Sequence, residues 1–358
     1  MRAMTKAPQN SNLDILRSVA VLAVFLCHLL QVIAGCKFGE RLAFGIETYS
    51  LGQIGVVIFF VHTSLVLMQS MERTGTRISQ SALLRYFYIR RAFRIYPLSI
   101  GAILIAIAFS IPANPLGVAY QWRGMRWFLA NILLIQNIGN IGSVSSPLWS
   151  LPFEVQMYLV LPLLFLQAKA PKGGIRLMEI YLASLFLSQL HPLLRYAPCF
   201  LAGVIAYRLL GILRPRLPSW LWCPAVLGIA AVYVASPYAE VSWVKDVLAC
   251  LALGVLIPLF NRSRGAIATA AAHVAKYSYG IYLCHMPILW LVYRKLAIPG
   301  WQRPVWLAIA MCTVPMACYY LIELPLIQLG TRLANRVAVA PVAAIIPDRA
   351  AIAVQDLA

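Results

Sequence analysis

Residues 13–30 read LDILRSVAVLAVFLCHLL, a nearly continuous apolar run with Asp14 and Arg17 at one end and His28 well inside it. An apolar helix of about this length crosses most of a bilayer. Arg17 and His28 are eleven residues apart. At ~100° per residue they lie about 20° apart around a helix and roughly 16 Å apart along its axis. The run therefore predicts a membrane-spanning helix with one polar stripe.

His28 is the most informative residue of this helix. An ionisable side chain at that depth is costly unless it faces a polar cavity, so we interpret it as functional. The structural alternative is a histidine that bonds a neighbouring helix and holds the bundle together.

The composition of the whole chain agrees with a membrane protein. Of its 358 residues, 61% are apolar and 11% charged, and the mean hydropathy is +0.79. These values exclude an ordinary soluble protein and predict an all-α, polytopic transmembrane helical bundle in contact with membrane lipid. The net charge is +19, and the basic residues gather in loops and at helix ends, where they determine membrane orientation. We therefore reject nucleic-acid binding. The eight cysteines lack the paired spacing of metal ligands, and no metal is expected.

The hydrophobic runs predict about ten spans plus one re-entrant or interfacial segment. That segment, Trp127–Ile138, would reach only ~18 Å as a helix, against a hydrocarbon core of ~30 Å. We expect a cytoplasmic leader at 1–12, an integral-membrane domain at 13–330 and a cytoplasmic tail at 331–358. The predicted spans are 13–34, 51–70, 95–111, 148–166, 178–194, 196–211, 220–236, 247–260, 277–293 and 305–327.

Basic residues set the predicted orientation. The segment from Arg73 to Arg94 has six arginines against Glu72 alone, and we interpret it as a cytoplasmic loop, which places both termini in the cytoplasm. The loop 237–246, with Lys245 and Asp246, would then be external.

Six segments carry polar or small residues in or beside the predicted spans. They are NLDILR (12–17) continuing to His28, GVVIFFV (55–61), RAFRIYP (91–97), LWSLPFEVQMY (148–158), YSYGIYLCH (277–285) and ELP (323–325). In this order they resemble the motifs of the acyltransferase 3 family, integral-membrane acyltransferases that modify surface glycans. Two departures concern helix packing or acceptor choice: Val57 replaces an acidic residue, and Thr63-Ser64 replaces Ser-Gly.

The resemblance implies an enzyme that transfers acyl groups other than amino-acyl groups. The expected donor is acyl-coenzyme A, with acetyl-coenzyme A first, and the expected acceptor is a glycan or glycolipid hydroxyl. The expected location is the bacterial inner membrane.

Two groups of residues are expected to carry the chemistry. Acyl transfer to an alcohol needs a general base, and a buried neutral imidazole can accept a proton, so His28 is the predicted base. We assign Glu154 and Asp14 to catalysis with it. A buried structural pair with an arginine is the alternative for Glu154, and a pair with Arg17 at the helix end is the alternative for Asp14.

A second set is expected to bind the substrates. Arginine binds phosphate bidentately, so Arg17, Arg91 and Arg94 are predicted to hold the coenzyme; the alternative is topology anchoring. Tyr158, His285 and Gln156 are assigned to substrate binding.

Two rival functions remain open from the sequence. A proton-coupled secondary transporter would use His28, Glu154 and His285 as a proton relay, although no internal repeat is visible. A flippase or assembly scaffold would not depend on His28.

Overall fold

The computed structural model describes residues 11–35, 47–76, 78–114, 121–236 and 242–339. Arg77, most of the expected leader, the first part of the expected loop 237–246, and the segment 340–358 lie outside these ranges. Within them the chain is predominantly helical and has no β-strand, and an isolated β-bridge joins Leu217 to Phe260. The predicted all-α fold class is confirmed.

The described residues form a succession of helices, several joined by short 3-10 or π turns. They are α1 (Ser11–Ala34), α2 (Thr48–Gly75), α3 (Gln80–Ala108), α4 (Met125–Ile132), α5 (Leu151–Lys169), α6 (Gly173–Leu190), α7 (Ala197–Leu210), α8 (Trp222–Ala235), α9 (Ser242–Leu256), α10 (Ala266–Trp290), α11 (Arg303–Cys318) and α12 (Leu324–Val339).

Each predicted span overlaps a helix. Among the described residues, seven stretches are long and apolar enough to cross a membrane: 11–34, 48–75, 80–108, 146–169, 192–210, 242–259 and 300–338. The other predicted spans correspond to α6, α8 and α10, which are shorter or less apolar. The protein is therefore a multi-pass membrane protein, and the count of ten crossings stays a prediction.

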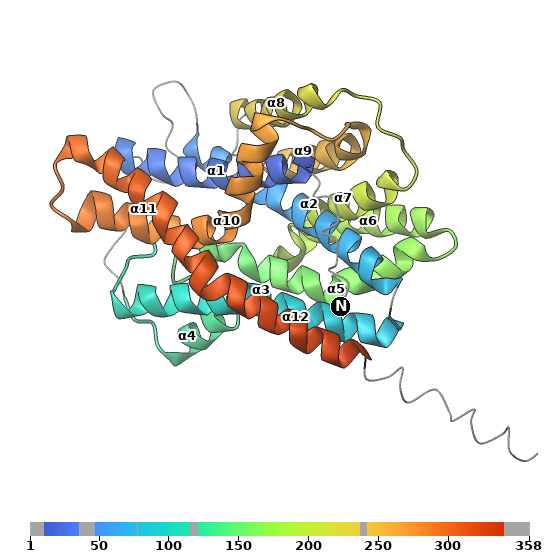
Figure 1. The fold of residues 1–358 in the computed structure, drawn as a ribbon, viewed down its shortest axis with the longest axis horizontal. Coiled ribbons are helices and arrows are strands. Elements are labelled where there is room, and N and C mark those ends of the chain that lie inside the picture. Colours follow the sequence, from blue (N-terminus) through green and yellow to red (C-terminus); the bar gives the residue numbers. More distant parts are fainter. Residues whose placement is uncertain (1–10, 36–46, 77, 115–120, 237–241, 340–358) are drawn as a thin grey trace, which may run out of the picture.

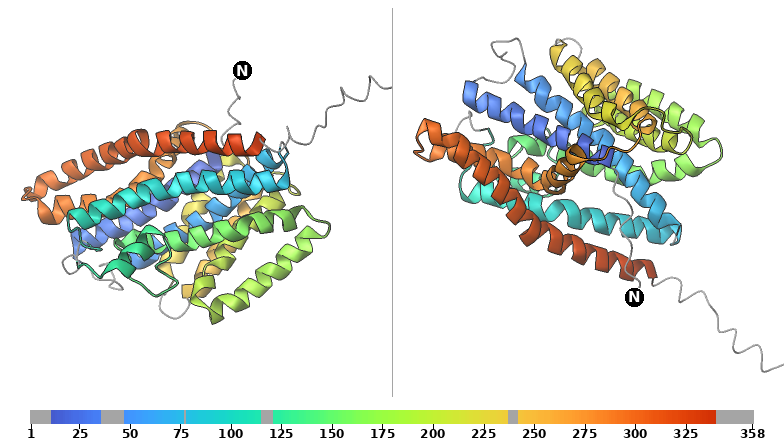
Figure 2. Two further views of the ribbon diagram at one scale, coloured as in Figure 1. Left: turned by 90° about the horizontal axis from the view of Figure 1, so that it is seen from below. Right: turned by 45° about the horizontal axis from the view of Figure 1, so that its top comes forward.

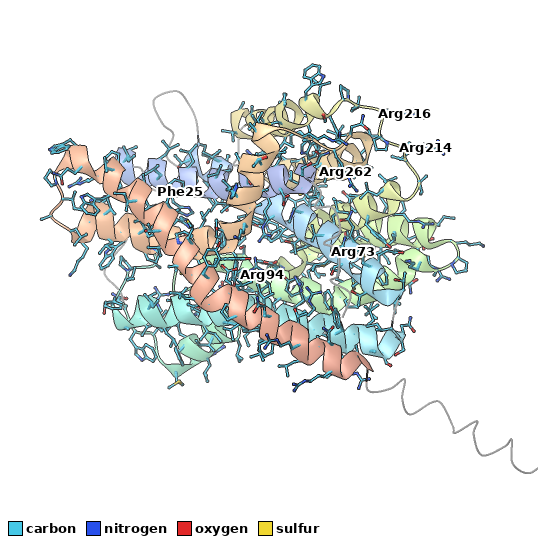
Figure 3. The ribbon with its side chains drawn as sticks, in the orientation of Figure 1. Phe25, Arg73, Arg94, Arg214, Arg216 and Arg262 are labelled. Carbon is cyan, nitrogen blue, oxygen red and sulfur yellow. The ribbon has the colours of Figure 1, made fainter. Side chains whose placement is uncertain are left out.

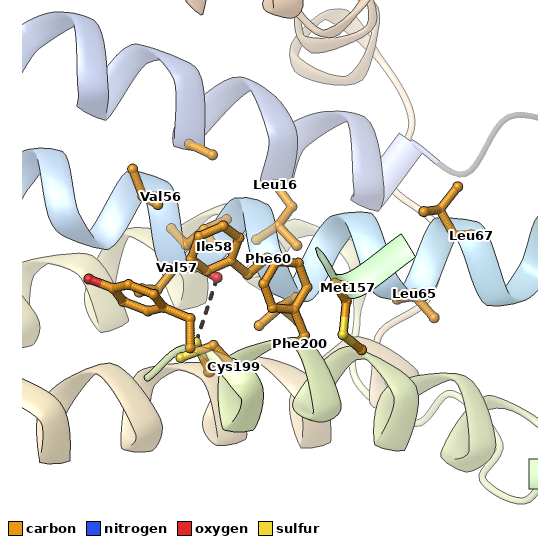
Figure 4. Packing of buried hydrophobic residues seen from close by; sticks show 14 of the residues in the cluster. Leu16, Val56, Val57, Ile58, Phe60, Leu65, Leu67, Met157, Cys199 and Phe200 are labelled. Atoms are coloured by element: carbon orange, nitrogen blue, oxygen red, sulfur yellow. Dashed lines mark hydrogen bonds between the residues drawn. The ribbon is translucent and has the colours of Figure 1, made fainter. Parts of the chain in front are cut away.

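Helix α2 occupies the centre of the bundle. It packs against α1 on one side and against α7 and α9 on the other, and Figures 1 and 2 show α6–α9 gathered on one side of it and α3, α11 and α12 on the other. Phe60 of α2 stacks on Phe200 of α7 with ring centroids 4.3 Å apart, as Figure 4 shows. A side chain at Gly55 would meet the Ala20 carbonyl oxygen of α1 at 2.5 Å. Glycine therefore allows the close approach of α1 and α2.

The segment between α3 and α5, which we call the hairpin, begins and ends at neighbouring positions. Its two ends are joined, because the Ser146 amide donates to the Ala113 carbonyl at 2.8 Å. Helix α4 has only 8 residues, about 12 Å. Several polar groups of the hairpin are hydrogen-bonded: the Val144 amide donates to Asn131 Oδ1 at 2.9 Å, and the side chains of Asn137 and Gln156 of α5 exchange two hydrogen bonds. This agrees with the expected re-entrant or interfacial segment.

Three boundary predictions are wrong. Arg85 to Arg94 lie inside α3 rather than in a loop, because α3 begins at Gln80 with Ser79 as its cap. The last helix continues through Glu323 to Val339, with a π turn at 319–323 ahead of Pro325. A π turn accommodates a proline within a continuous helix by re-registering the backbone bonds. The expected tail therefore begins with a helix that lies beside α3 (Figure 1).

The third correction concerns Lys245 and Asp246. Both lie in the first turn of α9 rather than in an external loop, and they are 7% and 1% exposed, respectively. Hydrogen bonds account for this burial: the Lys245 ammonium donates to Ser50 Oγ and to the carbonyls of Tyr233 and Ser236. Buried charges are tolerated when they are paired in this way.

Candidate active site

The first cavity, of about 110 Å³, lies among α1, α2, α3, α5 and α10. We call it the arginine cavity, because Arg17, Arg91 and Arg94 all line it. Arg17 Nε is buried without a hydrogen-bond partner among the described residues. A buried guanidinium with an unused donor is a ready partner for an anion.

The arginines of this cavity differ in their partners. Arg94 donates to Glu323 in an ion pair that joins α3 to the α11–α12 junction, and it lies over the Tyr279 ring at 5.3 Å. Arg91 makes no ion pair within the described chain. Three guanidinium groups (Arg17, Arg91, Arg94) meet two carboxylates (Glu154, Glu323), so with both carboxylates ionised one positive charge is in excess.

Glu154 also lines the arginine cavity. It accepts a hydrogen bond from Tyr158 at 2.5 Å, and both belong to the first two turns of α5. The i, i+4 spacing puts them on one face of the helix, as the sequence indicated. His62, for which a structural role is the expectation from its position in an apolar span, also lines this wall.

The second cavity, of about 240 Å³, contains His28, and we call it the histidine cavity. Its wall is rich in neutral hydrogen-bonding side chains and lacks arginine. The lining residues with polar side chains are Cys27, His28, Gln31, Tyr49, Gln53, Asn114, Ser146, Trp149 and Tyr282. Such a wall suits a neutral polyhydroxylated ligand better than an anion.

The hydrogen bonds of His28 determine its tautomer. Its Nδ1 lies 2.9 Å from the Val24 carbonyl oxygen, which can only accept, so Nδ1 carries the proton. His285 is held in the same way by the Ile281 carbonyl at 3.1 Å. Its Nε2 therefore faces His28 Nδ1 as an acceptor at 3.4 Å. Neutral His28 is left with a lone pair on Nε2, the arrangement that a general base needs.

The two cavities lie back to back. Val56 and Tyr282 line both of them. Tyr282 is fixed there because its hydroxyl donates to the Pro147 carbonyl at 2.6 Å and bonds Ser150 Oγ at 2.7 Å. These two side chains form a partition between the arginine cavity and the histidine cavity.

The cavities face opposite ends of the bundle. Along α1, Arg17 comes about three turns before His28. Figure 3 shows Arg73, Arg214 and Arg216 in one half of the molecule and Phe25, three residues before His28, in the other. The arginine cavity thus lies toward the arginine-rich end, and the histidine cavity toward the opposite end.

The predicted site residues are divided between these cavities. Glu154 and Tyr158 lie with the arginines and not with His28. His285 is fully buried behind His28. Gln156 lines neither cavity and instead forms hydrogen bonds with Asn137 of the hairpin. Asp14 also lines neither cavity. Their assigned roles stay predictions.

Several lining residues were not anticipated from the sequence. Gln53 is a glutamine inside an apolar span, the same signal that singled out His28, but it precedes the quoted motif of α2. Tyr282 stood within a quoted motif without a role. Asn114 and Ser146 reach the histidine cavity only because the hairpin folds back.

The chain resembles known acyltransferases. A family model described as an acyltransferase domain matches residues 10–324. Acyltransferase MdmB of Streptomyces mycarofaciens is 33% identical over 156 residues, which are 41% of this chain and 37% of that protein. Peptidoglycan O-acetyltransferase OatA of Listeria monocytogenes is 28% identical over 352 residues, covering 83% of this chain and 52% of that protein. The matches thus span about half, or less, of these relatives. No solved structure matches the chain.

Proposed function

This chain belongs to the acyltransferase 3 family, and from that membership we propose that it is a membrane O-acyltransferase. It moves a short acyl group, acetyl in the first place, from acyl-coenzyme A to a hydroxyl of a cell-surface or exported glycan. The observation that carries this proposal is the pair of cavities that meet at Val56 and Tyr282, one lined by arginine and one by His28.

The arginine cavity suits the donor. Coenzyme A carries phosphate groups, and guanidinium binds phosphate through two parallel hydrogen bonds. Arg17 and Arg91 are free of ion pairs among the described residues, and they are the groups that we propose contact the phosphates. Arg94 is held by Glu323 and contributes its charge and the shape of the wall.

The histidine cavity suits the acceptor. His28 Nε2 takes the proton of an acceptor hydroxyl while the oxygen of that hydroxyl forms the ester bond to the acyl carbonyl carbon. The carbon–sulfur bond breaks, and the coenzyme thiolate leaves with the proton that His28 had taken. The products are the acylated glycan and coenzyme A, and His28 returns to its neutral form.

The partition separates the reactants before transfer. For the thioester to reach His28, the acyl-bearing arm of the donor must pass between Val56 and Tyr282. A closed partition keeps water of the histidine cavity away from the thioester, which limits wasteful hydrolysis.

The orientation follows from charge. We propose that the arginine-rich end is cytoplasmic, where acyl-coenzyme A is made, and that both termini lie there, with the protein in the bacterial inner membrane. The similar protein OatA is a peptidoglycan O-acetyltransferase, which supports a glycan as acceptor class and acetyl as the acyl group. Neither a proton-coupled transporter nor a scaffold is favoured by a specific feature of the site, and family membership favours the enzyme.

One experiment tests the proposal. Bacterial membranes with and without the protein are given acetyl-coenzyme A labelled in the acetyl group. Release of coenzyme A and alkali-labile label in the glycan fraction are then measured, with mass spectrometry of the surface glycans. The proposal expects both signals to depend on the protein. Protein-dependent glycan esters that carry no label, with no release of coenzyme A, would overturn the donor, and no ester in any glycan would overturn the acceptor class.

A further inference from the structure

Gln53 lies in the wall of the histidine cavity and is 2% exposed. Its Nε2 donates both hydrogens, one to Tyr196 Oη at 3.1 Å and one to Asp246 Oδ2 at 3.3 Å. Its Oε1 is buried and has no hydrogen-bond partner within the described residues. Gln53 therefore presents one unused acceptor.

The amide of Gln53 is held in this orientation by Asp246. A carboxylate can only accept, so the amide nitrogen and not the oxygen must face it. Asp246 is itself fixed, because Tyr233 donates to its Oδ1 at 2.6 Å. Neither Asp246 nor Tyr196 lines the histidine cavity, whereas Gln53 does. With Nε2 turned toward those two partners, Oε1 is the polar atom of Gln53 left for the cavity.

The chemistry of that atom selects its ligand. A buried carbonyl oxygen without a donor is unfavourable, and the cavity is roomy enough for water to occupy it in the resting protein. A ligand that displaces this water must supply a hydrogen-bond donor of its own. A sugar acceptor has one, because it carries hydroxyl groups besides the one that reacts.

We propose that Gln53 Oε1 accepts a hydrogen bond from a second hydroxyl of the acceptor, and so holds the sugar while its reacting hydroxyl faces His28. Asp246 is a positioning residue that acts through Gln53. This inference rests on the proposed function and identifies the acceptor subsite within it. Lys245 supports this arrangement indirectly, because it donates to the carbonyl of Tyr233, whose hydroxyl donates to Asp246.

The test compares two fates of the acyl group in the same membranes. Total coenzyme A release measures donor consumption, and alkali-labile label in endogenous glycan measures transfer. A positioned acceptor competes with water for the acyl group, so loss of positioning lowers the fraction transferred while hydrolysis continues. Damage to folding lowers both signals together. The ratio of transfer to total release therefore separates the two causes.

Gln53→Leu matches the side chain in size and removes the acceptor oxygen. We expect the transferred fraction to fall about tenfold, the scale of one hydrogen bond, with donor consumption retained. Tyr196→Phe is the matched control: it removes one partner of Nε2 but leaves Asp246 to hold the amide, so the fraction should stay within about twofold of wild type. An unchanged fraction in Gln53→Leu, or an equal loss of both signals in a folded protein, would overturn the proposal.

Asp246→Asn tests the orienting role. An amide at this position can donate as well as accept, so Gln53 is free to turn its nitrogen to the cavity, and the transferred fraction should fall. In the Gln53→Leu background the same change should have little further effect on the fraction, because the atom that it orients is gone. Additive effects would overturn the orienting role. A wild-type protein that consumes no acetyl-coenzyme A would instead refute the proposed function itself, before any variant is compared.

Discussion

His28 and His285 are in direct contact, with His285 Nε2 3.4 Å from His28 Nδ1. Each ring is anchored by the carbonyl oxygen four residues earlier on its own helix, α1 for His28 and α10 for His285. The contact therefore fixes the orientation of the proposed base from two helices far apart in the sequence. When His28 takes a proton, the Val24 carbonyl and His285 both face the N–H of the imidazolium.

This arrangement predicts unequal losses at the two histidines. His28→Ala should leave a folded protein with acyl transfer reduced by at least about 100-fold, the scale of general-base loss. His285→Phe keeps the aromatic volume but removes the nitrogen that faces His28 Nδ1. Because His28 loses one hydrogen-bond acceptor and keeps its base, transfer should fall less, by about tenfold. Both rates are measured as label in glycan. Transfer near the wild-type rate in His28→Ala would refute its role as base.

Arg91 is predicted to bind the donor. Lysine at this position keeps the charge and loses the two-pronged geometry, so the KM for acyl-coenzyme A should rise several-fold. Arg73→Lys, near the end of α2 and outside the cavity wall, should leave the KM unchanged. Arg77, which lies outside the described residues, is expected to behave like Arg73. The same KM shift at Arg91 and Arg73 would mean that the arginines only orient the protein in the membrane.

The Arg94–Glu323 pair should contribute to stability. Only 1% of the Glu323 side chain and 18% of the Arg94 side chain are exposed, and removing one partner of a buried pair costs about 3–5 kcal/mol. Arg94→Ala is therefore expected to lower the unfolding temperature in detergent. The exposed pair between Lys169 and Glu72 provides the control, since Lys169→Ala should cost less than about 1 kcal/mol. Equal shifts of the unfolding temperature in the two variants would contradict the stabilising role of the Arg94–Glu323 pair.

Tyr282 should control access between the cavities. Tyr282→Ala removes one of the two side chains that separate them, so hydrolysis of acyl-coenzyme A should rise relative to transfer. Tyr282→Phe keeps the ring and loses only the bonds to Pro147 and Ser150, and its ratio of hydrolysis to transfer should stay near that of wild type. The ratio is read from coenzyme A release and glycan label. If both variants behave alike, the ring is not a barrier.

The hairpin between α3 and α5 gives a topological prediction. Engineered cysteines at 121–126 and 140–146, in a cysteine-free background, should react with an impermeant thiol reagent from the same outer side. Cysteines at 169–176 should react only after the membrane is opened. The hydrogen bond between the Ser146 amide and the Ala113 carbonyl joins the two ends of the hairpin. We therefore expect both arms of the hairpin to be accessible from the same side of the membrane. Labelling of 140–146 from the cytoplasmic side alone would make this segment a true crossing.

Much of the fold was determined by the sequence itself. Long apolar runs predict spanning helices because an unpaired backbone cannot lie in hydrocarbon, and every predicted span overlaps a helix. The embedded polar residues His28, Glu154 and His285 stood out by their cost at that depth. The shortness of Trp127–Ile138 predicts a segment that does not cross the membrane, and the labelling experiment tests that prediction.

Tertiary structure alone decided which polar residues share a cavity. The sequence grouped Glu154 with His28, but α5 places Glu154 with the arginines, on the other side of Val56 and Tyr282. Helical periodicity gives the face of each residue and not the rotation or depth of one helix against another, which depend on close contacts such as that of Gly55 with Ala20. For the same reason the sequence predicts Lys245 and Asp246 to be loop residues, whereas the structure places them in α9 with hydrogen bonds to α2. The acceptor subsite at Gln53 exists only through that contact.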